Sequence, residues 1–238
     1  ASLAGVKGNT TTQLAKYNEA KTELAASFIN DTAATIDLKL GVNYVFSTAK
    51  GDVANGLIST AIFAHPTLLT DVQKQADGTT LDLRYTSKVT LTVDKDMKPI
   101  TVTSSVDQRL STTIKFKLYT NATPIPLIRN EELLLLKAEI LWFTGDQAGA
   151  IAELNLVRDK SGKLPPLMVA PATDKAFVDA LLFERRYSLM FEGGHRWIDL
   201  RRFGIDLPLD ASDHVRNVRY PVPQGECDAR PGEAACMI

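Results

Sequence analysis

The second half of the chain places apolar side chains at the spacing of an α-helix. Residues 177–204, FVDALLFERRYSLMFEGGHRWIDLRRFG, have a broad apolar face, with acidic and basic side chains at the positions between. Residues 133–143 are apolar on nearly every side, which predicts a buried helix. The break that follows contains Gly145, which can end a helix, and Asp146, which can cap the next one. So short a turn predicts two helices that pack antiparallel.

The first half combines a helical pattern with a β-like region. Residues 12–30 carry one apolar stripe among helix-favouring residues, and residues 66–75 predict a second helix. Residues 81–118 alternate apolar and polar positions and are rich in β-branched side chains. From LDLRY onward, this segment is predicted to be a small irregular β-region. The whole pattern predicts a mostly α fold with a minor β-region.

Composition narrows the functions open to the chain. It has 238 residues and a formal net charge of −1, so it offers no basic surface for nucleic acid or an anionic membrane. No apolar run reaches the length that spans a bilayer. The sequence has no glycine-rich phosphate loop, paired Cys-x-x-Cys or nucleophile elbow, and we predict no cofactor.

The charged residues of 177–204 have two interpretations. Glu192, His195 and Asp199 stand at i, i+3 and i+7 and share one helix face, which would suit part of a metal site. However, metal-binding helices usually come in complementary sets, and the three histidines of the chain include no second Glu-x-x-His. We therefore expect no metal. A buried helix pair with local ion pairs is favoured instead, Glu192 with Arg196 and Asp199 with Arg202 or Arg196.

A carboxylate-based glycoside hydrolase is an alternative function. Such an enzyme needs two carboxyl groups about 5–10 Å apart across an open cleft, and Glu184, Glu192 and Asp199 are the candidates. Each has an arginine within a helical turn, which should lower its pKa and disfavour a general acid. The sequence therefore favours a protein that is not an enzyme. A helical scaffold that only binds a protein partner is a third possibility.

Three segments, in order, resemble the SusD/RagB family of outer-membrane, nutrient-binding lipoproteins. Residues 126–162 resemble the family's tetratricopeptide-like helix hairpin, which ends in N-x-x-R. Residues 184–204 resemble its ER…FEG-x-R-x-x-DL-x-R-x-G signature, and YPVPQGE, residues 220–226, resembles its closing segment. The resemblance covers residues 121–226 firmly and residues 1–120 loosely.

The resemblance implies one SusD/RagB-like domain over residues 1–238, the C-terminal portion of a longer protein, with a SusD-like helical fold. It implies non-catalytic binding of a nutrient such as a glycan at the extracellular face of the outer membrane. It also implies delivery of that ligand to a SusC-like TonB-dependent transporter. Ligand contacts are expected from aromatic side chains on loops or strands. The candidates in this sequence are Tyr44, Phe46, Tyr85 and Tyr119.

The resemblance gives the charged residues an architectural role, as buried ion pairs that fix how the last helix meets the hairpin. LDLRY, around Arg84, is a weaker likeness to the family's D-x-R. Trp142 and Trp197 are expected in the core, because both lie in apolar helices. Cys227 and Cys236 form either a local disulfide, which we favour, or two free thiols. The structural signature residues are Arg129, Glu139, Arg158, Glu184, Arg185, Glu192, Arg196, Asp199 and Arg202.

Overall fold

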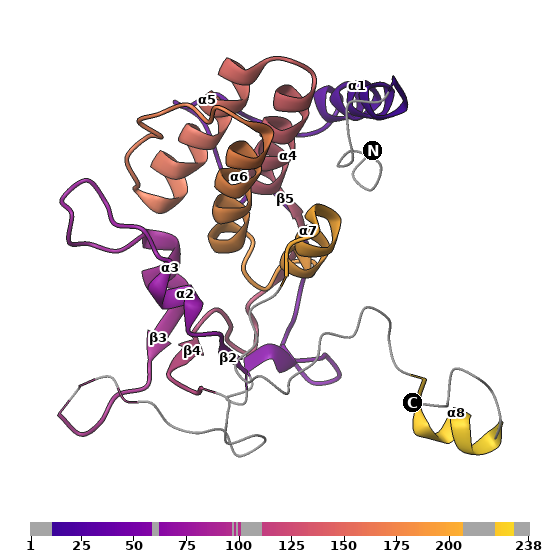
Figure 1. The fold of residues 1–238 in the computed structure, drawn as a ribbon. Helices are drawn as coiled ribbons and strands as arrows, with labels where there is room; N and C mark the ends of the chain where they lie inside the picture. The colour runs from indigo at the N-terminus through magenta and orange to yellow at the C-terminus, as the bar shows by residue number, and fades with distance from the viewer. Residues whose placement is uncertain are drawn as a thin grey trace. The chain divides into compact units, whose positions relative to one another are not determined.

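The structure, a computed structural model, separates the chain into one unit that ends at Asp206 and another that begins at Leu207. The described residues of the first unit are mostly helical, with two small sheets, and confirm the predicted fold class (Figure 1). The structure describes residues 11–58, 62–96, 98, 100, 111–206 and 222–230. The helices are α1 (Thr11–Ala25), α2 (Thr67–Thr70), α3 (Leu83–Lys88), α4 (Asn130–Phe143), α5 (Gln147–Val157), α6 (Asp174–Ser188), α7 (His195–Phe203) and α8 (Gln224–Ala229), with short turns η1 (Gly56–Ile58) and η2 (Arg158–Gly162).

Helices α4 and α5 form the antiparallel hairpin that the sequence predicts. Gly145 adopts a φ of +96°, a backbone conformation that glycine reaches without strain. The Asp146 side chain accepts a hydrogen bond from the Gly149 amide at 2.9 Å and so caps the start of α5. Both turn residues therefore have the roles predicted for them. Beyond α5, the π-helical turn η2 carries Arg158 into the protein interior.

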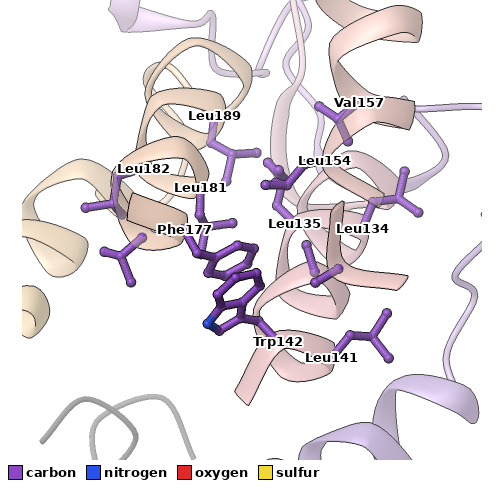
Figure 2. Packing of buried hydrophobic residues seen from close by; sticks show 13 residues of the cluster. Leu134, Leu135, Leu141, Trp142, Leu154, Val157, Phe177, Leu181, Leu182 and Leu189 are labelled. Atoms are coloured by element: carbon purple, nitrogen blue, oxygen red, sulfur yellow. The ribbon is translucent and has the colours of Figure 1, made fainter. Parts of the chain in front are cut away.

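The main hydrophobic core lies between this hairpin and α6 (Figure 2). Helix α6 is capped by Thr173, whose hydroxyl accepts a hydrogen bond from the Ala176 amide at 3.2 Å. The rings of Trp142 and Phe177 stack face to face, as Figure 2 shows. Their centroids are 4.2 Å apart and their planes differ by 5°. Figure 2 also labels Leu134, Leu135, Leu141, Leu154, Val157, Leu181, Leu182 and Leu189.

The chain changes direction between α6 and α7. Phe191, Gly193 and Gly194 all have positive φ values, of 65°, 52° and 69°. The two glycines adopt this conformation without strain, and they interrupt the helical pattern of residues 177–204. Helix α7 then ends at Gly204, which has a φ of +66°.

Two small antiparallel sheets complete the first unit. Strand β1 (Gly41–Tyr44) pairs with β5 (Ile125–Arg129), and a Cβ atom added to Gly41 would lie 2.2 Å from the Ile128 carbonyl oxygen. The second sheet has the order β2 (Phe63–Ala64), β4 (Ile114–Phe116), β3 (Val89–Leu91). Its buried side chains join those of α2, α3 and the end of α6 in a second core. The buried members of this core are Ala64, Leu68, Tyr85, Val89, Ile114, Tyr187 and Met190.

Two local predictions in the first half are wrong. LDLRY was expected to be β-structure, yet it leads into helix α3, because the Asp82 side chain accepts a hydrogen bond from the Arg84 amide at 2.8 Å and caps a helix there. The helix predicted for residues 66–75 is shortened to the four residues of α2. At LDLRY, local hydrogen bonding decides the backbone conformation against the periodicity of the side chains.

The prediction that Trp197 belongs to the core is also wrong. Helix α7 buries Asp199 and Leu200, whereas Trp197 is 38% exposed. The Arg201 guanidinium lies 5.7 Å from the centre of the indole ring. The amphipathic pattern of α7 therefore turns its tryptophan toward solvent.

The described part of the second unit is helix α8, which contains Cys227. This residue is not a free thiol. Its predicted partner Cys236 lies outside the described residues, so their pairing stays a prediction, and the first two residues of the closing YPVPQGE segment also lie outside them. Among the helices that the structure describes, none is both long enough and apolar enough to cross a membrane.

Candidate functional site

Most of the structural signature residues lie in three buried clusters of opposite charge. In the first cluster, the Glu184 carboxylate accepts hydrogen bonds from Arg84 and Arg158, each at 2.6 Å. Arg84 also binds Asp82 at 2.6 Å. Two guanidinium groups thus face two carboxylates, and the cluster ties α6 to α3 and η2.

The second cluster surrounds Arg129 at the end of β5. Its guanidinium binds both carboxylate oxygens of Glu192, at 2.7 and 2.9 Å, and also contacts the Glu131 carboxylate. It donates a further hydrogen bond to the Ser188 carbonyl oxygen at 2.7 Å, and the Lys88 ammonium contacts the same oxygen. Because the Ser188 hydroxyl accepts from Arg84 at 3.0 Å, this residue joins the first two clusters.

The third cluster holds α7 against the hairpin. Arg185 donates to Glu139 at 2.8 Å and to Asp199 at 2.9 Å, so it bridges α4 and α7. Arg202 donates to the same Glu139 carboxylate at 3.1 Å, and the Tyr17 hydroxyl donates to it at 3.0 Å. One buried glutamate therefore joins residues of α1, α6 and α7 to α4.

The local pairs expected within residues 177–204 are wrong. Glu192 binds Arg129 and Asp199 binds Arg185, and neither partner lies within a helical turn in sequence. Arg202 binds Glu139 of α4 rather than Asp199. Side chains on the inner face of a helix meet neighbouring elements, so their partners come from distant segments. Arg196 is half-buried on α7, where burial and the nearby Arg186 lower the pKa of its guanidinium.

Burial has a larger effect than the paired arginines on the pKa of Glu184. Arginines were expected to lower the pKa of the three candidate carboxylates, but burial outweighs Arg84 and Arg158 and raises the pKa of Glu184. Catalysis is disfavoured because a substrate cannot reach these three carboxylates. Glu184, Asp199 and Glu192 are 0%, 4% and 9% exposed, and each is bound to arginine. They lie in three separate clusters with no open face for a substrate.

The residues of the metal hypothesis do not converge either. Glu192 faces Arg129 and Asp199 faces Arg185, whereas His195 Nε2 lies 3.3 Å from the Glu132 carboxylate. Within the described parts of the chain, no three histidine, cysteine, aspartate or glutamate side chains are grouped to hold an ion.

The pairing of His195 with Glu132 makes stability depend on pH. The Glu132 carboxylate raises the pKa of His195 above its ordinary value, against the opposing effect of burial. A raised pKa stabilises the folded state fully below about pH 6.5, and this contribution is lost as pH rises through the folded-state value. We expect the stability difference between the protein and His195→Gln, measured by urea denaturation, to shrink between pH 6 and 8.5. A difference that is constant or grows over this range would contradict the assignment.

The aromatic candidates for ligand contact lie on different elements. Tyr44 is 54% exposed on β1, where its ring meets Phe46 edge to face with centroids 4.9 Å apart. Tyr85 is buried in the second core. Tyr119 is half-buried and donates to the Phe191 carbonyl oxygen at 3.4 Å, and burial raises its pKa to about 12. Of the three tyrosines, only Tyr44 presents an open ring.

A groove with an aromatic lining lies where the ends of four helices meet α1. Its volume is about 740 Å³, within the range of ligand sites. Sequence reasoning missed it, because its lining comes from segments far apart in the chain. The one local signal is the Trp142–Phe143 pair at the end of α4, just before the Thr144-Gly145 turn. The lining residues are Gln13, Leu14, Tyr17, Trp142, Phe143, Gly145, Gln147, Asp174, Lys175, Val178, Asp179, Phe203, Gly204 and Ile205.

Part of the chain matches a known protein family. Residues 112–221 match the profile of the SusD family. This range contains the α4–α5 hairpin and helices α6 and α7. This part of the chain is therefore similar to the SusD family, in agreement with the resemblance of its sequence signature. None of the curated protein sequences compared with it matches.

Solved structures share the fold. Surface glycan-binding protein A from Bacteroides uniformis superposes with a TM-score of 0.59 and 18% sequence identity, over 92% of this chain and 56% of that one. NanU of B. fragilis superposes with a TM-score of 0.52 and 16% identity, over 85% of this chain and 53% of that one. The present chain thus spans little more than half the length of these two proteins.

Proposed function

We propose that the protein binds glycans as a non-catalytic component of nutrient uptake at the cell surface. The observation that carries this proposal is the match of residues 112–221 to the SusD family. The likeness of the fold to a surface glycan-binding protein from Bacteroides uniformis supports it. The buried carboxylates support a binding role in a different way, because arginines occupy the groups that a hydrolase would need.

The three ion clusters then have an architectural function. They fix α6 and α7 against the hairpin and leave ligand recognition to other surfaces of the fold. In the fuller form of this proposal, the protein lies at the extracellular face of the outer membrane. It passes its ligand to a SusC-like TonB-dependent transporter, as the family resemblance implies.

Affinity gel electrophoresis against a panel of soluble polysaccharides tests the proposal, with product analysis of the same mixtures in parallel. We expect retarded migration in at least one polysaccharide without release of shorter sugars. Steady release of products would instead indicate a hydrolase. Migration unchanged in every gel, confirmed by calorimetry with oligosaccharides, would remove glycan binding by this chain and favour the protein-binding scaffold.

A further inference from the structure

The groove bounded by α1 and the ends of α4, α5, α6 and α7 has the lining that a saccharide requires. A sugar ring has an apolar C–H face and a rim of hydroxyl groups, so it needs apolar or aromatic walls with a few fixed polar groups. Here the partly exposed rings are those of Phe143 and Phe203, whereas the other two aromatic lining residues, Tyr17 and Trp142, are almost fully buried. The buried Tyr17 ring stacks on Phe143 with centroids 5.3 Å apart and so supports the half-buried Phe143 ring at the groove.

The polar side chains of the groove come chiefly from α5 and α6. Asp174 accepts a hydrogen bond from the Trp142 indole nitrogen at 2.9 Å, and Asp179 binds Lys175 at 2.6 Å. Each carboxylate uses one oxygen in these contacts, so the other can accept a hydroxyl hydrogen bond. The exposed amide of Gln147 offers both a donor and an acceptor. The rim is therefore richer in acceptors than in donors, which suits the hydroxyl groups of a sugar.

The charged side chains of the lining indicate which classes of sugar the groove can bind. Its charged members are the carboxylates of Asp174 and Asp179 and the ammonium of Lys175, and this ammonium is already paired with Asp179. A uronic acid or a phosphorylated sugar would meet an unpaired carboxylate, whereas a neutral or amino sugar would not. We infer that this groove is the glycan-binding site and that it takes neutral or amino saccharides in preference to acidic ones. This inference rests on the proposed function and adds to it a place and a ligand class.

Trp142 offers a direct readout of the groove. The chain has two tryptophans, so Trp197→Phe leaves Trp142 as its sole indole without altering a groove residue. A saccharide that bonds to Asp174 changes the environment of the Trp142 indole, because the two are hydrogen-bonded. Titration of Trp197→Phe with neutral xylo- and gluco-oligosaccharides, chitosan oligomers and oligogalacturonate should shift the Trp142 emission with the first three probes. The affinity for oligogalacturonate should be at least about tenfold weaker.

Substitutions at the groove test its location. Phe203→Ala removes an aromatic wall and Gln147→Ala removes a rim amide, and each should weaken binding by about tenfold in calorimetry. Phe28→Ala, a more exposed phenyl ring outside the groove, is the matched control and should bind as the unaltered protein does. Thermal melting of each variant checks that the fold is retained.

The outcomes separate this inference from the function on which it rests. If oligosaccharides bind by calorimetry but Trp142 emission is unchanged and both groove variants bind normally, the groove is excluded and glycan binding stands. Tyr44→Ala would then examine the exposed ring of β1 as the competing site. If oligogalacturonate binds best, the ligand class is wrong. If no saccharide binds at all, the proposed function itself fails.

Discussion

Replacement of Glu184 by glutamine is expected to lower the free energy of unfolding by about 3–5 kcal/mol. The Glu184 side chain is fully buried and accepts hydrogen bonds from Arg84 and Arg158. The neutral amide leaves the two buried guanidinium groups of this cluster with a single carboxylate, Asp82, which pairs with Arg84. Such a loss is a large fraction of the stability of an ordinary domain, and urea denaturation measures it.

The matched control is Glu19→Gln, the same change in an exposed ion pair with Lys16. Solvent screens that pair, so we expect no measurable loss of stability. A double variant, Arg158→Met with Glu184→Gln, should lose less than the sum of the two single variants, because it removes one of the stranded charges together with its partner. Equal effects of Glu184→Gln and Glu19→Gln, or strict additivity in the double variant, would show that the cluster does not act as a unit.

The sequence predicts the helical hairpin well because the signals that shape it are local. Gly145 and Asp146 determine the turn through backbone conformation and a side-chain cap, and each acts within three residues. The same is true of Thr173 at the start of α6 and of the glycine pair before α7. In contrast, the strand predicted at LDLRY is wrong, because one aspartate cap outweighs the alternation of its side chains.

The partners in the ion clusters could not be predicted from local spacing. Arg84 and Glu184 are 100 residues apart, and Arg129 and Glu192 are 63 residues apart. A helical pattern shows that such charges must be buried, but it does not show which element supplies the opposite charge. The groove was missed for the same reason, since its aromatic walls come from α1, α4 and α7. Only the family resemblance, which treats distant segments together, indicated that these charged residues have a shared role.

The second large effect is expected from Phe177→Ala, at about 3–5 kcal/mol of lost stability. The ring is completely buried, stacks on Trp142 and meets Phe143 edge to face with centroids 6.4 Å apart. Alanine removes both ring contacts and leaves a cavity that the rigid hairpin cannot collapse to fill. Urea denaturation gives the energy, and near-ultraviolet circular dichroism should lose the signal of the stacked indole. Met168→Ala, at a side chain that is 86% exposed, is the control and should stay within about 0.5 kcal/mol.

Phe177→Leu distinguishes burial from ring stacking. Leucine restores most of the apolar volume, so most of the stability should return, with a remaining deficit of about 0.5–1.5 kcal/mol from the lost aromatic pair. If Phe177→Leu is as unstable as Phe177→Ala, then the flat shape of the ring, and not its apolar volume, determines the stability of this core. A variant as stable as the unaltered protein would mean that the stacked geometry adds nothing beyond burial. Trp142 belongs both to this core and to the lining of the groove. A stability between those of Phe177→Ala and the unaltered protein would therefore show that the stacking that stabilises the hairpin also holds a residue of the proposed binding site.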